Sequence, residues 1–327
     1  MRNGQRAKSQ TNGAPDATVF QSNAAMLLIV LVAVIAFFSV MNRNYFSYTN
    51  MTNILLGSST VGLLAIGETY LIIAGHIDLS CAHAAALFGV WTALLINGGM
   101  PWGLTILFVL VFSSAVGLAN AGLVNIFGLQ PFIATLAISE VCEGVGFLIC
   151  NGQSVLINKG SFVVLGSMKL LGISFPAWVL IILFLVCGFI LAKTLFGRSV
   201  YMIGGNQTAA HLAGLNPKRI STILYVMSSM IAAVAGVLMA AKMQSGQPAS
   251  ATGAEFDAIT AAILGGVAFT GGKGNLLGCF IGLLIIECFG NGLTVLNVSS
   301  FWQMVAKGLL LIAALIVDYV RRKRLDT

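Results

Sequence analysis

Residues Ala24–Met41 read AAMLLIVLVAVIAFFSVM, an unbroken apolar stretch in which Ser39 is the only side chain with a hydroxyl group. A helix of roughly 20 apolar residues is long enough to cross the hydrocarbon core of a bilayer. The rest of the chain has the same character, since 58% of its residues are hydrophobic and only 8% are charged. The long uncharged runs do not alternate apolar with polar residues, which excludes an outer-membrane barrel. The composition therefore predicts an all-α polytopic membrane protein.

Similar apolar stretches recur as far as the C-terminus. We expect about ten transmembrane helices, because a spanning helix satisfies its own backbone hydrogen bonds within the lipid. Ala24–Met41 is longer than a signal-peptide core and is expected to be retained. The third and eighth segments are too short to cross comfortably, which predicts broken or re-entrant helices there. The segments are Ala24–Met41, Ile54–Gly75, Cys81–Ile96, Leu104–Phe127, Phe132–Cys150, Pro176–Thr194, Ile220–Ala241, Phe256–Phe269, Leu276–Leu296 and Phe301–Val320.

The basic residues predict the orientation, because cytoplasmic loops carry an excess of Lys and Arg. They cluster before the first span, between spans six and seven, and after the tenth, and these clusters share one side only if the number of spans is even. We therefore expect a cytoplasmic tail over 1–23, a membrane domain over 24–320 and a basic cytoplasmic tail over 321–327. Loops 151–175 and 242–255 would then face outward. The clusters are Arg2, Arg6 and Lys8; Lys193, Arg198, Lys218 and Arg219; and Arg321, Arg322, Lys323 and Arg324.

The formal net charge of +7 and the six cysteines suggest little further chemistry. The basic residues lack the interleaved aromatics of a single-strand binder, so we expect no nucleic acid partner. No cysteine falls in a CxxC pair, and the cysteines are expected to be small buried hydrophobes rather than ligands or disulfides. We expect no metal, no cofactor and no catalytic residue.

A weak internal repeat is visible. If spans two to five repeat as seven to ten, the odd offset inverts one copy in the membrane, as in many transporters. Asn120-Ala-Gly-Leu stands before a new span at Pro131-Phe132, and Asn291-Gly-Leu stands before a new span at Phe301-Trp302. The glycine-interrupted stretches Gly75–His83 and Gly265–Gly274 occupy comparable places.

The segment Gly204–Gly214 predicts a short helix between spans six and seven. Gly204 and Gly205 allow the backbone to turn tightly after the preceding helix. Asn206 is a good N-cap for a helix over Gln207–Leu212. Gly214 suits the end of that helix. Such a helix is either an ordinary capped surface helix or an element that docks in a groove on a partner.

Further motifs follow in order: Gly253-Ala-Glu255-Phe-Asp257, Gly265-Gly266, Gly271-Gly272-Lys273-Gly274 and Asn291-Gly292-Leu293. Together with Gly204–Gly214, this series resembles the membrane-spanning permeases of bacterial ribose-type sugar importers, which belong to the ABC transporter superfamily. The resemblance covers almost the whole chain, from the Phe46–Asn53 region to Asp318.

The resemblance implies a permease subunit of the bacterial inner membrane that forms a homodimer among the membrane lipids. It would receive a monosaccharide from a periplasmic sugar-binding protein and be driven by a separate cytoplasmic ATP-binding subunit. The coupling loop to that ATPase would comprise Gly204, Gly205, Asn206, Ala209, Ala210 and Gly214. The chain has no Walker A motif of its own: Gly271-Gly272-Lys273-Gly274 lacks the earlier glycine and the Ser or Thr after the lysine. The subunit is therefore not expected to be an enzyme.

Polar residues inside the spans are candidates for the sugar route, because charged and polar groups in a bilayer usually face a cavity or a partner. Each could equally belong to a static polar seam between helices. Glu287 and Lys307 could form a gating ion pair, and Gly278 and Gly282 predict a close helix contact. The candidate pathway residues are Asp78, Ser80, Asn120, Glu287 and Asn291.

The chain departs from the ribose-type pattern in two places. That pattern usually reads Gly-Ile-Asp-Leu-Ser-Val-Gly-Ser, where this chain has His76-Ile-Asp-Leu-Ser-Cys-Ala-His83. Glu143-Gly144 stands where an Arg-Gly pair is usual. The histidines could sense pH, bind a metal or be satisfied structural residues. The sequence does not identify the sugar, so the substrate could be a pentose, a hexose or a polyol-like compound.

A rival hypothesis is a stand-alone secondary transporter coupled to protons. It would use Glu68, Asp78, His76 or His83, and it would need no ATPase.

Overall fold

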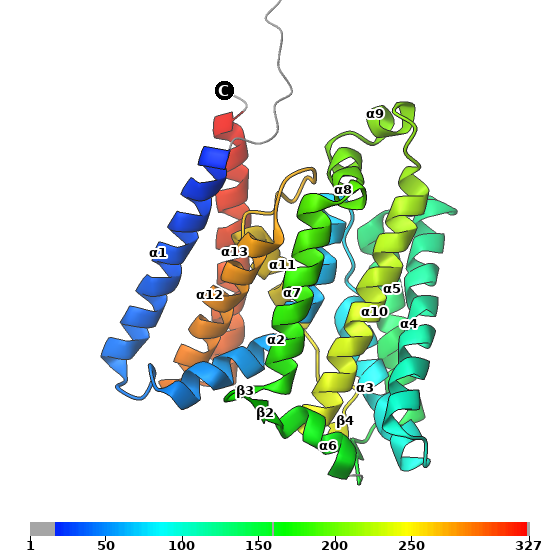
Figure 1. Ribbon diagram of the computed structural model, residues 1–327, viewed down its shortest axis with the longest axis vertical. Coiled ribbons are helices and arrows are strands. Elements are labelled where there is room, and N and C mark those ends of the chain that lie inside the picture. The colour runs from blue at the N-terminus through cyan, green and yellow to red at the C-terminus, as the bar shows by residue number, and fades with distance from the viewer. Residues whose placement is uncertain (1–16, 159, 326–327) are drawn as a thin grey trace, which may run out of the picture.

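A computed structural model describes residues 17–158 and 160–325 of the protein, and these residues are almost entirely helical (Figure 1). Four two-residue strands form two small antiparallel pairs. The helices are Ala17–Met41 (α1), Tyr48–Ile73 (α2), Cys81–Asn97 (α3), Trp102–Asn125 (α4), Pro131–Ile149 (α5), Gly160–Ser167 (α6), Phe175–Lys193 (α7), Leu195–Gly205 (α8), Gln207–Leu212 (α9), Pro217–Met243 (α10), Ala254–Leu264 (α11), Leu276–Val295 (α12) and Ser300–Leu325 (α13). The strands are Val155–Leu156 (β1), Lys169–Leu170 (β2), Ile173–Ser174 (β3) and Ser245–Gly246 (β4).

Each predicted span corresponds to a helix, and the fold is that of an all-α polytopic membrane protein. Within the described residues, seven helices are long and apolar enough to cross a membrane: α2, α4, α5, α7, α10, α12 and α13. The apolar part of α1, Ala25–Met41, and α3 are somewhat shorter, and α11 has only 11 residues. The third and eighth segments are thus short, as their sequences predict.

Three helix ends lie away from the ends of the predicted spans. α1 begins at Ala17, inside the expected tail 1–23, while Arg2, Arg6 and Lys8 lie outside the described residues. α13 continues to Leu325, and of the basic tail only the Lys323 side chain is described. α11 ends at Leu264 rather than Phe269 because Gly266 takes φ +90°, a conformation that favours glycine and breaks the helix.

The buried centre of the molecule is formed by α2 and α10. The share of the span that is buried is 83% for α2 and 72% for α10, but 22% for α4 and 6% for α13. α2 packs against α10, α11 and α12, and α10 packs against α2, α3 and α4. Each of the two central helices thus contacts the short helix of the other half of the chain, which is the arrangement expected if α2–α5 and α10–α13 form an inverted repeat.

Glycines allow α11 and α12 to pack with their backbones in contact. A Cβ atom added to Gly278 would lie 2.0 Å from the Gly265 carbonyl oxygen, and one added to Gly282 would lie 2.3 Å from that of Ala261. Only a residue without a side chain fits either place. The predicted close contact at Gly278 and Gly282 is confirmed.

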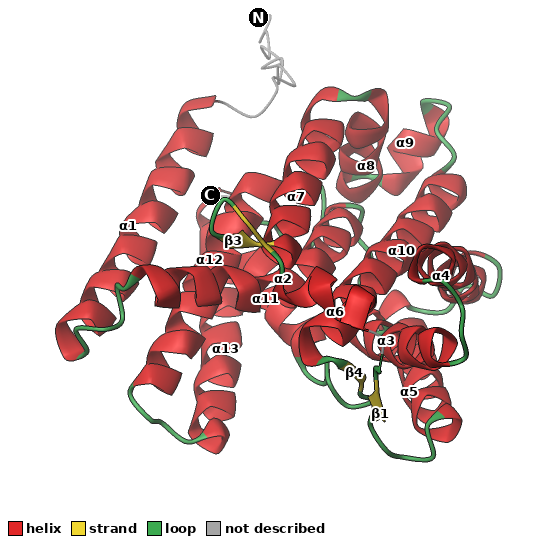
Figure 2. Ribbon diagram, turned by 60° about the horizontal axis from the view of Figure 1, so that its bottom comes forward, coloured by secondary structure: helices red, strands yellow, loops and turns green. Residues whose placement is uncertain are grey.

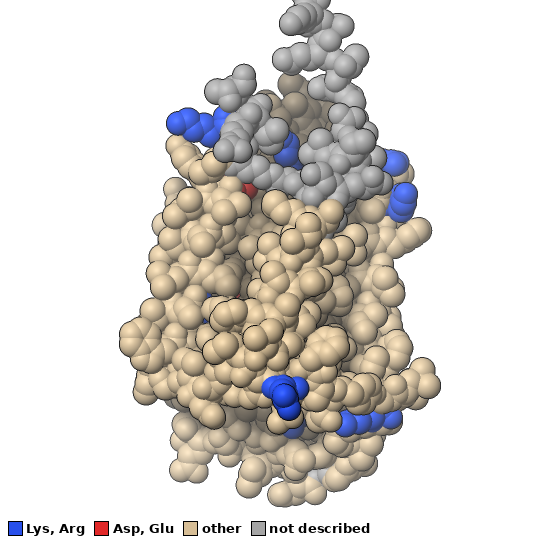
Figure 3. Space-filling view, turned by 90° about the vertical axis from the view of Figure 1, so that its left-hand side faces the viewer, with Lys and Arg blue, Asp and Glu red and all other residues tan. Residues whose placement is uncertain are grey.

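The two ends of the bundle are built from different elements. The N-terminal end of α1, the C-terminal end of α13 and helices α8 and α9 share one end, which we call the α9 end (Figure 1). At the other end, the hairpin end, β1 pairs with β4 and β2 pairs with β3 beside α6 (Figure 2). The predicted outward loops 151–175 and 242–255 therefore meet each other. On the face in Figure 3, Lys and Arg lie toward both ends, and the wide belt between them is nearly uncharged.

The two glycine-interrupted stretches also meet, but they are not equivalent in the repeat. Gly272 donates its backbone N–H to the Ile73 carbonyl at 2.8 Å, so the connection after α2 lies against the connection after α11. The first stretch precedes the short helix α3, whereas the second follows the short helix α11. Their comparable places in the sequence therefore reflect a contact and not a repeat.

Candidate functional site

The α9 end carries the predicted short helix. Asn206 caps α9, because its side-chain oxygen accepts a hydrogen bond from the Ala209 N–H at 2.9 Å. Gly214 takes φ +87° and donates its N–H to the His211 carbonyl, which ends the helix in the left-handed conformation expected there. The sequence therefore places the cap, the helix and its end correctly.

α9 presents most of its surface to the outside of the protomer. Ala210 is buried, while Gln207, Thr208 and Ala209 are exposed. Leu212 is 83% exposed. A short, capped surface helix of this kind is either an ordinary surface helix or an element that docks on another protein.

α8 connects α9 to the centre of the bundle through backbone contacts. A Cβ atom on Gly204 would lie 1.7 Å from the Ile73 carbonyl oxygen and 2.7 Å from the Gly272 nitrogen. A Cβ atom on Gly205, by contrast, would have no neighbour within 4 Å in the described structure. The Tyr201 hydroxyl also donates to the Gly274 carbonyl at 2.7 Å. α8 thus rests on the end of α2 and on the connection that leads into α12.

The structure brings three of the predicted pathway residues together in the interior. The Asp78 carboxylate accepts hydrogen bonds from the backbone N–H and the hydroxyl of Ser80, and from the Ser228 hydroxyl at 3.0 Å. The Asn120 amide donates to the Ser80 oxygen at 2.8 Å. All four residues are buried. These bonds fix the break between α2 and α3 against α4 and α10.

Two buried oxygens beside this cluster have no hydrogen-bond partner within the described structure: Glu68 Oε2 and Asn120 Oδ1. The other Glu68 oxygen lies 3.6 Å from the Cys81 sulfur. An unpaired buried polar atom costs about 1–3 kcal/mol, so this interior retains unused hydrogen-bonding capacity.

The other two pathway candidates lie elsewhere, on α12 near the start of α2. The Asn291 oxygen accepts from the Asn50 amide at 2.9 Å, and Glu287 Oε2 lies 3.2 Å from the place of a Cβ on Gly57. The predicted ion pair of Glu287 with Lys307 is not formed: Lys307 bonds to Asp257, with Nζ 2.5 Å from Oδ2, and interacts with Glu287 only at longer range. The reason is that α11 lies against both α12 and α13, which places the Asp257 carboxylate of α11 beside Lys307.

The two sequence departures meet in space. The His83 ring on α3 places Nε2 3.8 Å from Glu143 Oε2 on α5, and its Nδ1 lies 2.7 Å from the Ser139 hydroxyl oxygen. Residues 83 and 143 are far apart in the sequence, and no local pattern predicts this contact. His76 lies in the connection after α2, 3.3 Å from the Tyr225 hydroxyl, and burial lowers the pKa of its ring to about 4. His76 is therefore neutral at physiological pH.

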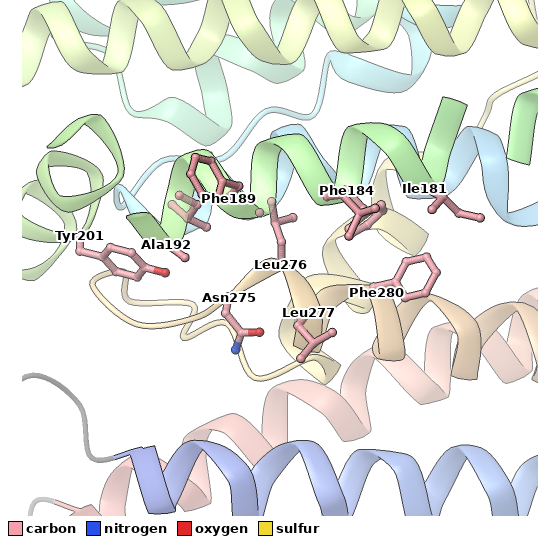
Figure 4. Close-up of a pocket in the computed structure, with 12 residues that line it drawn as sticks. Ile181, Phe184, Phe189, Ala192, Tyr201, Asn275, Leu276, Leu277 and Phe280 are labelled. Carbon is pink, nitrogen blue, oxygen red and sulfur yellow. The ribbon is translucent and has the colours of Figure 1, made fainter. Parts of the chain in front are cut away.

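A cavity of about 460 Å³ lies between α7 and α12, toward the α9 end (Figure 4). Its lining is apolar, with Phe184, Phe189 and Phe280 prominent, and Tyr201 and Asn275 provide its polar edge. None of the predicted pathway residues lines it. In the described part of the chain, no three His, Cys, Asp or Glu side chains are grouped so as to hold a metal ion.

Comparison with known proteins gives a consistent result. Residues 50–315 match a family described as the permease component of the branched-chain amino acid transport system. The chain is 34% identical to the ribose import permease protein RbsC of Haemophilus influenzae, over 94% of this chain and 96% of the relative. It is 33% identical to the L-arabinose ABC transporter permease protein AraH of Azospirillum brasilense, over 96% of each chain. It is 35% identical to the probable ABC transporter permease protein YphD of Escherichia coli, over 92% of this chain and 91% of the relative. No solved structure matches the chain.

The chain belongs to the family of transport permease components that matches residues 50–315.

The relatives named as permeases of ABC transporters match almost from end to end, and this confirms the resemblance to sugar-importer permeases. The permease is a translocation component, and the rival hypothesis of a stand-alone proton-coupled transporter is not supported.

Proposed function

We propose that this permease is the membrane-spanning subunit of an ATP-driven monosaccharide importer in the bacterial inner membrane, with both termini in the cytoplasm. Two copies pair in the lipid and associate with a cytoplasmic ATP-binding subunit, which hydrolyses the ATP. A periplasmic sugar-binding protein delivers the substrate. The relatives named for ribose and arabinose support a sugar of this size.

The observation that carries this proposal is the α8–α9 element. α9 is capped, exposed and ends in Leu212, so it has the surface of a docking helix. α8 touches the end of α2 and the connection into α12 through Gly204. A displacement of α9 is therefore transmitted through backbone contacts of α8 to α2 and to the connection into α12, without a flexible side chain in between.

Transport follows from a change in helix packing rather than from covalent chemistry. α2, α10 and α12 pack through glycines and small residues, which permit two discrete arrangements of the same helices. ATP-driven closure of the partner subunits moves α9, and the bundle switches between outward-open and inward-open states. The candidate pathway residues Asp78, Ser80, Asn120, Glu287 and Asn291 provide polar groups along that route.

The hairpin end suits the sugar-binding protein. β1 and β4 join the two predicted outward loops into one surface, with Val155 opposite Gly246. This surface is held by backbone hydrogen bonds and lies at the end opposite α9 (Figure 2).

The test is uptake of radiolabelled D-ribose and L-arabinose by cells that carry the permease with its candidate ATPase and binding protein. Deletion of either partner is expected to abolish uptake, and a protonophore is expected to leave uptake intact while ATP is maintained. Uptake that persists without the ATPase and stops with the proton gradient would contradict the proposal.

A further inference from the structure

Two acidic side chains interrupt the otherwise apolar outward face of α5, a helix that is long and apolar enough to cross a membrane. Glu140 is exposed, and the Glu143 side chain is 31% exposed. Neither has a Lys or Arg partner within the described residues. A charge that faces lipid chains costs several kcal/mol, so this face borders water, a solute or another protein.

Behind this face, the hydrogen bonds around His83 can be assigned. The Ser139 hydroxyl donates its proton to the Leu79 carbonyl at 3.0 Å, so it can only accept from His83 Nδ1 at 2.7 Å. Nδ1 therefore carries a hydrogen atom, and Nε2 is the ring nitrogen that is left for another hydrogen-bond partner. Nε2 is buried and has no hydrogen-bond partner among the described residues, since Glu143 Oε2 at 3.8 Å is too far away.

α11 also packs against α3, and its first turn carries a second buried carboxylate. Glu255 lies in the first turn of that helix, is only 6% exposed and interacts electrostatically with His83. Its Oε2 is buried and has no hydrogen-bond partner within the described structure. α3 and α11 thus each hold a buried polar atom without a hydrogen-bond partner in the described structure, and Glu143 on α5 lies beside the first of them.

We propose that His83, Glu143 and Glu255 form a hydroxyl-binding site on the translocation route, specific for neutral polyhydroxylated solutes. The inference rests on the proposed function and deepens it. Neighbouring hydroxyl groups of a sugar donate to the two carboxylates and to His83 Nε2, which satisfies atoms that the protein leaves unpaired. The same carboxylates repel a sugar acid or a sugar phosphate, so anionic solutes are rejected.

The experiment is a cycle that pairs protein variants with substrate analogues in the complete transporter reconstituted in vesicles. Initial uptake rates are measured at saturating loaded binding protein, for D-ribose and L-arabinose and for analogues of each that lack one hydroxyl group. The variants are E255Q and E143Q, with E140Q as the matched control. E140Q removes a carboxylate from the same face of α5 without a contact to His83.

In the wild type, loss of the hydroxyl that reaches the site is expected to lower the rate by about tenfold or more, the usual scale for a hydrogen bond to a charged group. In E255Q or E143Q this penalty is expected to fall below about twofold, while E140Q keeps it. The aldonic acids of the two sugars should be refused by the wild type and accepted better by E143Q. Equal penalties in the wild type and all three variants would overturn the site.

Two further readouts keep the result interpretable. If E255Q does not fold, as judged by size-exclusion chromatography, E143Q alone decides, because its side chain is partly exposed. A wild type that shows no ATP-dependent uptake of either sugar would contradict the proposed function itself, which is a different result from equal penalties.

Discussion

At the scale of single residues, the adjacent glycines Gly204 and Gly205 allow the backbone contact of α8 to be tested against a position that has no such contact. Gly204→Ala would place a methyl group 1.7 Å from the Ile73 carbonyl, whereas Gly205→Ala meets nothing within 4 Å. We expect G204A to displace α8 and lower ATP-dependent uptake by about tenfold, which corresponds to ~1.4 kcal/mol. G205A, the matched control, should keep at least half of the wild-type rate. Equal rates for the two variants would show that α8 does not transmit force through this contact.

The pair of Lys307 with Asp257 gives a second prediction at this scale. Lys307 also interacts electrostatically with Glu287, so K307M leaves two acids in the membrane domain without this cation. D257N removes one acid and leaves Lys307 to interact with Glu287. We expect K307M to lower the Tm of the purified permease more than D257N does, because unpaired charges in the membrane are costly.

Thermal unfolding in detergent measures this difference, and the reversed pair D257K/K307D should recover part of the loss. A larger effect of D257N would instead indicate that the cation, and not the acids, needs the partner.

At the scale of helices, the cap of α9 offers a variant that affects one element alone. N206A removes the acceptor for the Ala209 N–H, which costs about 1 kcal/mol at a helix N-terminus. α9 has only 6 residues, so the loss should fray it while the bundle stays intact. We expect ATP hydrolysis stimulated by loaded binding protein to fall roughly fivefold, the factor that 1 kcal/mol represents.

N206S serves as the control for that experiment, because serine is also a good N-cap and should keep most of the stimulation. Basal hydrolysis by the ATPase and the Tm of the permease should stay unchanged in both variants. A fall in Tm with N206A would mean that α9 supports the fold rather than the coupling.

The helices themselves could be predicted from the sequence because each one is locally specified. Apolar length places α4, α7 and α12, and Asn206 and Gly214 place α9. α1 starts earlier than predicted because its first residues are polar and nothing in their composition distinguishes a helix from a tail. The β1–β4 pair was missed, since two-residue strands have no pattern and their partners lie far apart in the chain.

The candidate site could be predicted only where its members share a motif. Asp78 and Ser80 are neighbours in the chain, and the structure places Asn120 beside them. The contact of His83 with Glu143 depends on how α3 packs against α5, which no single segment specifies. Lys307 was assigned to the wrong acid because α12 precedes α13 in the sequence, while in space α11 also lies against α13.

At the scale of the whole molecule, the two ends should be reachable from opposite sides of the membrane. The six native cysteines are buried, so the wild type should react little with a membrane-impermeant maleimide. Gln153→Cys, at an exposed position of the hairpin end, is expected to label in intact cells. Leu212→Cys, on α9, should label only after the membrane is opened, because the positive-inside rule places that end in the cytoplasm. Labelling of Leu212→Cys in intact cells would reverse the orientation.

The pairing of Asp257 with Lys307 also bears on how the protein is made. The two residues are 50 positions apart, so α11 emerges from the ribosome well before the helix that carries its counter-charge. α11 is also too short to remain in lipid alone, and its close neighbour α12 is synthesised after it. Insertion of this segment must therefore wait for later parts of the chain. A nascent chain released before α13 would hold α11 at the membrane surface, where quality-control proteases could reach it.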